Sequence, residues 1–540
     1  MASSTQKEKP SWESRRRLSL ASNFGSRQDL YHSIFDRKQQ IIACQLFFDD
    51  DGSDTAPSIA QIQDMVDTLG NRLERLRGIP TDLFDKHGKK TGQRVFRDVN
   101  DWSAARQKII VDVPLESDTK DEARLFLEQV KLKDILPEEV GVEVPLWRIY
   151  RVGRRSLVLC VDHCIGDGLS LASLFAVVAT DDDSSNNTLR LEDVSPLFEA
   201  FSKLKWWQMF IIQWAFLWPL NFLRCIKYLK NMMSKAVEPM SPLMPEGMEE
   251  AIKTKKITKI PREKYATVYL PPVPVSLLKS LSKGKGAHIT LSDVLVTLVG
   301  DTVRNYFQLV GYASEEPIHF GVPVAIPIKP LSHYLDESDG LNSVYTPTGH
   351  KLPLTRSLSF SDLLDEMHES FQFTRDSYIT SFMLFIFRLL SMFTKPDDMV
   401  DDMKKGVGNA TFVWSNVPGP RAPIFIKGHR VSEIQCVVSN PFTMLQTCSY
   451  DGMVYTNIQV DIRTAIKSEL LSQAHLESVK AAIQELLLPG SQQDNALRTL
   501  AEAASGHNPG PFFSRVNEED VSKAKETSCD MGKDGQSLAQ

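Results

Sequence analysis

The residues best suited to chemistry lie between Asp162 and Gly168, in the sequence DHCIGDG. An imidazole, a carboxylate and a glycine follow an apolar run, Ser156 to Val161, so an H-x-x-x-D-G pattern leaves a predicted strand at a sharp chain reversal. A histidine held there can take a proton from a hydroxyl group, which typically contributes roughly 100- to 10,000-fold to a rate. The pattern also fits a turn histidine that bonds only neighbouring backbone, because short motifs recur by chance.

Each motif residue has an expected role in that chemistry. We expect His163 to be the general base and Asp167 to hold the turn, with an arginine as one partner through which it could do so. Gly168 would let the backbone pass close to the substrate. These three residues are the candidate catalytic set.

Strands and helices alternate around this turn. Apolar residues at helical spacing predict an amphipathic helix over residues 59–76. A buried strand is expected over 41–48, strands over 146–150 and 156–161, and helices over 121–132 and 169–178. Such alternation is typical of an α/β lobe.

A second lobe is expected from about residue 265. Thr290 to Asp293 has the form of a helix start, and Asp451-Gly452 between two apolar runs predicts a β-hairpin. Further strands are expected over 318–326 and 410–414, and helices over 294–307, 361–374 and 468–487. The strand ending at Trp414 leads into Ser415-Asn416-Val417-Pro418-Gly419-Pro420.

The segment Trp206 to Leu223 is aromatic-rich and uncharged, and basic residues follow it. Its length is near the roughly 20 residues that span a bilayer, although a buried core helix is the alternative. A full span would put His163 and Asn416 on opposite sides of a membrane. We therefore expect a re-entrant or interfacial insertion, with both lobes on the cytosolic side.

Composition limits the class of protein. The chain has 540 residues and a net charge of -6, which argues against a nucleic-acid partner. The 7 cysteines are scattered without a C-x-x-C pair, as expected for reduced thiols facing the cytosol. The expected segments are a disordered tail (1–38), an N-terminal lobe (39–200), a membrane-associated segment with a basic linker (201–260), a C-terminal lobe (261–490) and a mostly disordered tail (491–540).

Several motifs, in this order, resemble those of the bacterial and plant wax ester synthase/diacylglycerol acyltransferase family. They are Pro145-Leu146-Trp147, the H-x-x-x-D-G turn, Val322-Pro323-Val324, Gly340-Leu341-Asn342, Ser415 to Pro420, and Ser449-Tyr450-Asp451-Gly452. The resemblance covers roughly residues 40 to 490. The S-N-V-P-G-P element is the most specific, whereas H-x-x-x-D-G is shared with other CoA-dependent acyltransferases and with peptide-condensation domains.

The resemblance implies a two-lobed α/β fold like that of chloramphenicol acetyltransferase, with the active-site channel between the lobes. It implies direct acyl transfer from acyl-CoA to a lipid hydroxyl, with His163 as base and no covalent intermediate. The acceptor would be diacylglycerol or a long-chain alcohol. Acyl-CoA is a substrate, and neither a cofactor nor a metal ion is expected. The implied location is the endoplasmic reticulum membrane, or lipid droplets, with the active site facing the cytosol.

The resemblance also implies a set of substrate-binding residues, namely Asp162, Asp293, Asn342, Ser415, Asn416, Pro418 and Gly419. For Ser415 and Asn416 a tight structural turn is an equal alternative. Two positions depart from the family pattern: Asp162 replaces the first of two histidines, and Ser292-Asp293 replaces Asn-Asp.

Two other functions stay open. The Asp162 change is compatible with a lipid-binding protein that keeps the acyltransferase fold without catalysis. An acyltransferase or condensation enzyme with a soluble acceptor such as an amine is the second, although the Trp206 segment argues against it.

Overall fold

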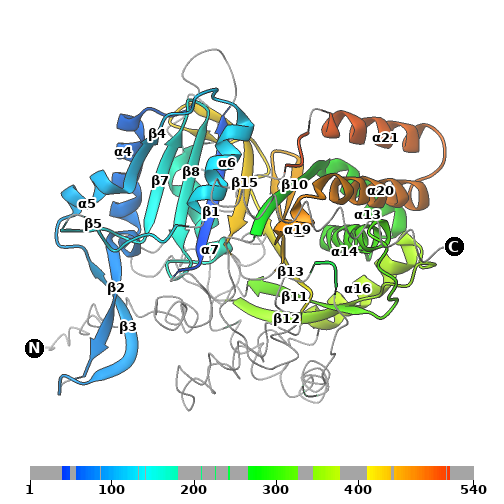
Figure 1. The fold of residues 1–540 in the computed structure, drawn as a ribbon, viewed down its shortest axis with the longest axis horizontal. Helices are drawn as coiled ribbons and strands as arrows, with labels where there is room; N and C mark the ends of the chain where they lie inside the picture. Colours follow the sequence, from blue (N-terminus) through cyan, green and yellow to red (C-terminus); the bar gives the residue numbers. More distant parts are fainter. Residues whose placement is uncertain are drawn as a thin grey trace, which may run out of the picture.

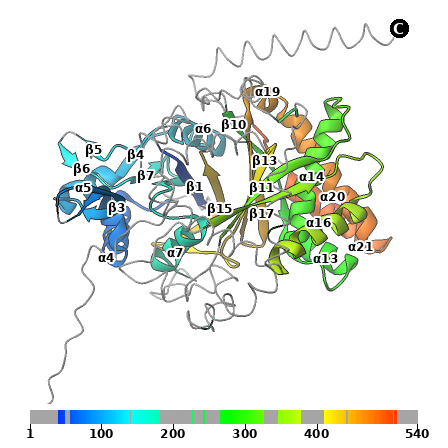
Figure 2. The same cartoon turned by 90° about the horizontal axis from the view of Figure 1, so that it is seen from below.

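A computed structural model of the chain has two β-sheets side by side, each covered by helices (Figure 1). It describes residues 39–48, 56–85, 87–131, 133–139, 141–180, 208, 226, 241–243, 265–325, 345–376, 410–439, 443–505 and 507–510. The two sheets and their helices form two lobes, seen from below in Figure 2. The expected two-lobed α/β architecture is therefore confirmed.

The first sheet has seven strands in the order β4-β7-β8-β1-β15-β14-β9. Their bounds are β4 (Ile110–Val113), β7 (Trp147–Val152), β8 (Ser156–Asp162), β1 (Ile41–Phe48), β15 (His429–Val438), β14 (Phe425–Ile426) and β9 (Ala179–Thr180). Strands β14 and β15 come from the C-terminal half of the chain and pair with β9 and β1. The expected lobe boundary therefore differs from the structure, because part of residues 261–490 completes the N-terminal sheet.

Helices cover both faces of this sheet. The amphipathic helix α4 (Ile59–Arg72) starts at a capping box between Ser58 and Gln61. Its apolar face packs in the same core as that of α7 (Gly168–Val178). Helix α6 (Lys120–Val130) packs on the opposite face, where the amide of the buried Gln45 donates to its Ala123 carbonyl at 3.0 Å.

The second sheet has six strands in the order β10-β17-β16-β13-β11-β12. Their bounds are β10 (Tyr265–Pro274), β17 (Met453–Asp461), β16 (Met444–Tyr450), β13 (Phe412–Pro418), β11 (Ile318–Ala325) and β12 (Tyr345–Leu352). The β16–β17 hairpin turns at Asp451 and Gly452, which have φ values of 44° and 75°. The expected Asp-Gly hairpin is confirmed.

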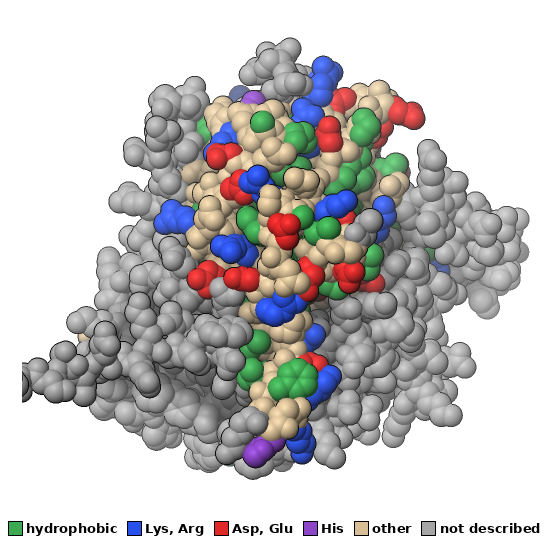
Figure 3. All heavy atoms as spheres, turned by 90° about the vertical axis from the view of Figure 1, so that its left-hand side faces the viewer, with side chains coloured by type: hydrophobic (Ala, Val, Ile, Leu, Met, Phe, Trp, Pro, Cys, Tyr) green, Lys and Arg blue, Asp and Glu red, His purple; other side chains and the backbone are tan. Residues whose placement is uncertain are grey.

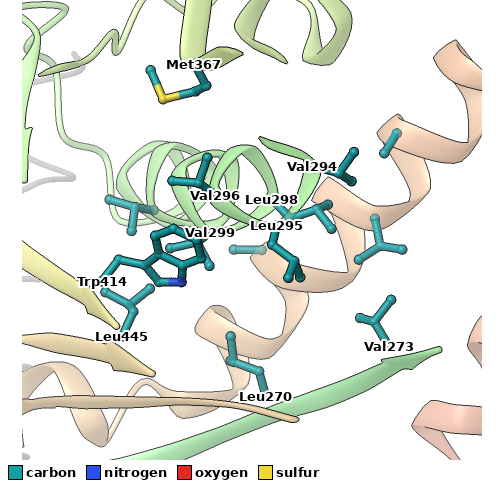
Figure 4. Close-up of a cluster of buried hydrophobic side chains, with 14 of the residues drawn as sticks. Leu270, Val273, Val294, Leu295, Val296, Leu298, Val299, Met367, Trp414 and Leu445 are labelled. Atoms are coloured by element: carbon teal, nitrogen blue, oxygen red, sulfur yellow. The ribbon is translucent and has the colours of Figure 1, made fainter. Parts of the chain in front are cut away.

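One large apolar core lies between the second sheet and its helices (Figure 4). The helices are α13 (Val275–Lys285), α14 (Leu291–Leu309), α16 (Phe360–Asp376), α19 (Ile462–Ala465), α20 (Ser468–Leu486) and α21 (Ser491–Ala504). Helix α14 is buried along most of its length, and its side chains meet Trp414 of β13 in this core. Helix α21 lies inside the tail expected from residue 491, with Leu500 buried, so the ordered lobe extends past that boundary.

Hydrogen bonds from a buried ion pair join the two lobes. The ammonium of Lys131, just after α6, is fully buried against Glu128, and it donates to the Thr267 hydroxyl of β10 at 2.7 Å. Glu128 also accepts from the Thr267 backbone N–H at 3.1 Å. Arg124 of α6 pairs with Glu433 of β15 at 2.9 Å. These contacts fix α6 against strands from both sheets.

A two-stranded hairpin, β2 (Gly78–Phe84) and β3 (Lys90–Asp98), projects from the N-terminal lobe (Figure 1). Figure 3 views the molecule from this side and shows basic, acidic and hydrophobic side chains along the projection. Its base is anchored by the buried Phe96, whose ring lies 4.9 Å from the guanidinium carbon of Arg75. Smaller elements of this lobe are a 3-10 turn (Glu74–Arg77), α5 (Trp102–Ile109), β5 (Glu138–Glu139) and β6 (Val142–Glu143).

Within the described part of the chain, every helix is too short or too polar to cross a bilayer. The Trp206–Leu223 segment lies outside the described residues apart from Gln208. Its expected membrane insertion stays a prediction.

Candidate functional site

The turn that carries His163 directly follows strand β8. The His163 backbone N–H donates to the Gln40 carbonyl at 2.8 Å, which continues the β8–β1 ladder by one residue. Ile165 N–H closes the turn on the Asp162 carbonyl at 3.0 Å. Helix α7 begins at Gly168, and Leu171 N–H donates to the Asp167 carbonyl at 2.8 Å. The predicted order of strand, turn and helix is confirmed.

The environment of His163 favours a neutral imidazole. Burial lowers the pKa of His163, and the negative charge of Asp167 opposes this effect in part. Asp167 is itself buried, with 7% of its surface exposed. An imidazole that is neutral at pH 7 is in the form that accepts a proton.

Asp162, at the position of the family's first histidine, has a fully buried carboxylate. One oxygen accepts from the Cys164 backbone N–H at 2.8 Å, so the side chain fastens the turn around His163. The other oxygen, Oδ2, has no hydrogen-bond partner among the described residues. Loss of solvation raises the pKa of Asp162 to about 7. The side chain therefore bonds the turn itself, which gives it a structural role beside any contact with substrate.

An arginine also holds this turn, through the Ile165 carbonyl. The buried guanidinium of Arg75 donates to the Ile165 carbonyl at 3.3 Å. Arg75 lies in the short 3-10 turn after α4, about 90 residues from its partner, and no motif marks it. Sequence reasoning missed it for that reason.

The structure brings the His163 turn against the S-N-V-P-G-P motif of the other lobe. A Cβ atom built on Gly168 would lie 3.2 Å from Cγ2 of Val417 in strand β13. The Val417 side chain thus packs close against the Gly168 backbone, and the expected approach of that backbone to the substrate stays a prediction. Two motifs about 250 residues apart in the sequence meet at one point of the fold.

Ser415, Asn416 and Pro418 belong to strand β13, which pairs in parallel with β16. The expected strand end at Trp414 is therefore wrong, and these residues do not form a tight turn. The strand continues because Thr447 of β16 donates its hydroxyl to Asn416 Oδ1 at 2.9 Å, tying the two strands together. Pro418, the last residue of β13, costs few ladder bonds there.

Gly419 follows β13 at a point where no side chain fits. A Cβ atom on Gly419 would lie 2.1 Å from the Ser449 carbonyl oxygen. Its N–H donates to the Ser449 hydroxyl at 3.2 Å. The glycine of the S-N-V-P-G-P motif is therefore required by the close approach of Ser449, the first residue of the S-Y-D-G motif.

Of the remaining two predicted site residues, the structure describes only Asp293. The Asp293 carboxylate caps helix α14 through Thr290 N–H at 2.9 Å and contacts His368 Nδ1 at 3.0 Å. Its side chain is fully buried in the C-terminal lobe, in contacts that serve the helix cap. Asn342 lies outside the described residues.

The described residues hold no group of three or more His, Cys, Asp and Glu side chains arranged to bind a metal ion. The described site brings together His163 and the buried carboxylates of Asp162 and Asp167, and Val417 of strand β13 packs against Gly168. This set can position a hydroxyl and accept its proton.

Residues 350–482 match the model of the WS/DGAT C-terminal domain. This stretch contains the S-N-V-P-G-P and S-Y-D-G motifs, and the His163 turn lies outside it. No curated protein matches the chain in sequence.

Solved structures share the fold at low sequence identity. A wax ester synthase/diacylglycerol acyltransferase from Marinobacter aquaeolei VT8 is 14% identical, with a TM-score of 0.52 over 87% of this chain and 100% of that chain. The first condensation domain of the CDA synthetase is 12% identical, with a TM-score of 0.51 over 88% of this chain and 99% of that one. The EpoB cyclization-docking bidomain from Sorangium cellulosum is 11% identical, with a TM-score of 0.52 over 88% and 86%.

The predicted resemblance is thus confirmed in the C-terminal lobe by the domain match and over the whole chain by the fold. Acyltransferases and condensation domains share this two-lobed architecture. Residues 350–482 are thus similar to the WS/DGAT C-terminal domain, and the fold is shared with a wax ester synthase/diacylglycerol acyltransferase over 87% of this chain.

Proposed function

We propose that this chain, whose residues 350–482 carry a WS/DGAT C-terminal domain, is an O-acyltransferase that moves a fatty acyl group from acyl-CoA to a lipid hydroxyl. The observation that carries the proposal is the contact of the Gly168 backbone with Val417. It joins the turn that holds a potential base to the strand that holds the most specific motif of the family.

In the proposed reaction, His163 takes the proton from the acceptor hydroxyl as its oxygen attacks the thioester carbonyl carbon. The tetrahedral intermediate then expels the CoA sulfur, and the imidazolium returns a proton to it. No bond forms between the protein and the acyl group. The low pKa of His163 suits this role, since the imidazole stays unprotonated near pH 7.

The turn residues would set the position of that imidazole. The Asp162 carboxylate accepts a hydrogen bond from Cys164 N–H, and Arg75 donates one to the Ile165 carbonyl. The backbone that follows His163 is therefore held at two points. A base is effective only within hydrogen-bond reach of the proton that it takes. Ser415 and Asn416 would line the acceptor side, with Asn416 oriented by Thr447.

For the acceptor we propose diacylglycerol or a long-chain alcohol, which require the same chemistry. We further propose that the protein works at the endoplasmic reticulum membrane or at lipid droplets, with its active site on the cytosolic side. The aromatic segment Trp206 to Leu223 supports this proposal by its composition.

The test is an incubation of the purified full-length protein with radiolabelled palmitoyl-CoA and, separately, hexadecanol, dioleoylglycerol or a soluble amine. Labelled wax ester or triacylglycerol is the expected product. His163→Ala should abolish most of it, whereas His87→Ala, an exposed histidine on the projecting hairpin, should not. Undiminished ester formation by His163→Ala contradicts the mechanism, and product only with the amine contradicts the acceptor class.

A second candidate function is a non-catalytic lipid-binding protein on the same fold. The observation that favours it is Asp162, which replaces the first motif histidine with a buried carboxylate. Saturable binding of palmitoyl-CoA without turnover, for any of the three acceptors, would support that function instead.

A further inference from the structure

Three cysteine side chains meet where the two sheets join. Cys44 of β1 lies directly opposite Cys436 of β15, and their sulfur atoms are 3.4 Å apart. The thiol of Cys448, on β16 of the second sheet, also donates to Cys436. All three are free thiols, and neither the motifs nor the proposed acyl transfer uses them.

The environment of Cys436 favours the thiolate form. The Cys436 thiol hydrogen-bonds Cys44 at 3.4 Å, and its contacts with the Cys44 and Cys448 thiols hold the pKa of Cys436 well below its usual range. By contrast, burial raises the pKa of the Cys164 thiol well above it. Because the thiolate is the nucleophilic form of cysteine, this shift adds to the 3.4 Å approach of the two sulfur atoms in favouring Cys436 as the attacking thiol.

Solvent exposure also favours reaction at Cys436 over reaction at the buried thiols. Cys44 and Cys436 are half-buried, whereas Cys160 and Cys164 are buried, with 1% and 0% of their surfaces exposed. A small oxidant can therefore reach the pair between β1 and β15 more readily than the other two thiols.

The strand register suits a disulfide between Cys44 and Cys436. Directly opposite residues of antiparallel strands have Cα atoms about 4.5–5.5 Å apart, within the roughly 4.4–6.8 Å that a disulfide spans. The sulfur atoms need to approach from 3.4 Å to about 2.05 Å. Side-chain rotation can supply this change with both strands in place.

We propose that Cys44 and Cys436 form an oxidation site at which a hydroperoxide closes a reversible disulfide between β1 and β15. The Cys436 thiolate attacks one peroxide oxygen, the O–O bond breaks, and Cys436 becomes a sulfenic acid. The Cys44 thiol then displaces the sulfenic hydroxyl, forming the S–S bond and releasing water. Overall, two thiols and one hydrogen peroxide give one disulfide and two waters.

The disulfide would link residues 392 positions apart. Strand β15 belongs to the C-terminal half of the chain and pairs with β1. On its other side β1 pairs with β8, the strand that leads into His163. Oxidation would therefore add a covalent link between β1 and β15, and reduction would remove it. Closing so long a loop restricts the unfolded chain, so the oxidised protein should be harder to unfold.

The experiment uses full-length protein in which Cys225 and Cys529, both outside the described residues, are replaced by serine. Reduced protein is treated with hydrogen peroxide, alkylated, digested without reductant and analysed by mass spectrometry. The expected product is a peptide pair linked through Cys44 and Cys436. In a Cys44→Ser variant, dimedone should instead trap a sulfenic acid at Cys436.

Matched variants make the assignment specific. Cys448→Ser should still form the Cys44–Cys436 link, and Cys160→Ser should behave like the parent protein. The midpoint of thermal unfolding should rise on oxidation, return on treatment with dithiothreitol, and stay constant in Cys44→Ser. Cys436 labelling as slow as that of Cys160, or a dominant link from Cys436 to Cys448, would overturn the proposal.

Discussion

The two halves of the candidate site are built in different ways. The N-terminal half is a turn in which the buried carboxylates of Asp162 and Asp167 flank the half-buried His163. The C-terminal half is a strand in a parallel pair, where Asn416 bonds Thr447 and Gly419 bonds Ser449. The difference suggests that proton transfer belongs to the turn, whereas the strand sets the shape of the space around it.

The largest effect should come from removing the base in the turn. We expect His163→Ala to lower the rate of acyl transfer by roughly 100-fold or more, because a positioned base typically contributes that much. The thermal midpoint should change little. Steady-state assays and circular dichroism melts check both outcomes, and an equal loss in Asn416→Ala would contradict the division of roles.

In the strand half, substitutions that add volume should lower the stability of the protein more than substitutions that change charge. Gly419→Ala places a Cβ atom against the Ser449 carbonyl, and we expect a loss of about 3 kcal/mol in the free energy of unfolding, the upper end for overpacking. Gly321→Ala in the neighbouring strand β11 is the control, because its Cβ atom would have an ordinary 3.6 Å contact with Val413. Urea unfolding measures both, and equal losses would refute the packing argument.

A smaller effect on the free energy of unfolding should come from the buried carboxylate of Asp162 in the turn. The pKa of Asp162 is raised to about 7 in the folded protein, above its unfolded value. Its ionisation therefore destabilises the fold progressively as pH rises from the unfolded pKa towards 7, and the cost is fully present above 7.

Replacement by asparagine removes that ionisation and keeps an oxygen that can accept from Cys164 N–H. We expect the stability of Asp162→Asn relative to the parent to grow between pH 5 and pH 8 by on the order of 2 kcal/mol. Urea unfolding at each pH measures it, with the exposed Asp112→Asn as control. A constant difference across this range would mean that Asp162 does not titrate there.

The smallest expected effect tests the contact between the halves. Gly168→Ala should cost about 1 kcal/mol or less, because Val417 Cγ2 must yield by only a few tenths of an ångström. Val417→Ala should relieve that crowding, so the double variant should be more stable than the sum of the single losses predicts. Additive losses would mean that the turn and the strand do not press on each other.

Local features were predictable from the sequence. The Asp451-Gly452 hairpin, the helix start at Thr290 and the turn after β8 each depend on residues close together in the chain. The pairing of β15 with β1 was not predictable in this way, because it joins residues almost 400 positions apart and β15 mixes apolar residues with polar ones such as Glu433 and Gln435. For the same reason the Arg75 contact with Ile165 and the thiol cluster stayed hidden.

The site prediction had a similar limit. Residue types identified His163, and the glycines at 168 and 419 were predicted from motifs without the contacts that require them. Asp293 matched a family position, yet its carboxylate is occupied by the cap of α14 and by His368. A motif identifies the residue, whereas only the folded structure shows which of its side-chain atoms already have hydrogen-bond partners.

The position of β15 also governs how the protein can be made. Strand β1 ends at Phe48, whereas its partner β15 starts at His429, so the ribosome needs roughly 20 to 80 s to synthesise the intervening chain. During that time β1 is an unpaired edge, the kind of surface that recruits other chains. A nascent or truncated N-terminal half should therefore need a chaperone or the membrane surface to cover the free edge of β1 until β15 has been synthesised.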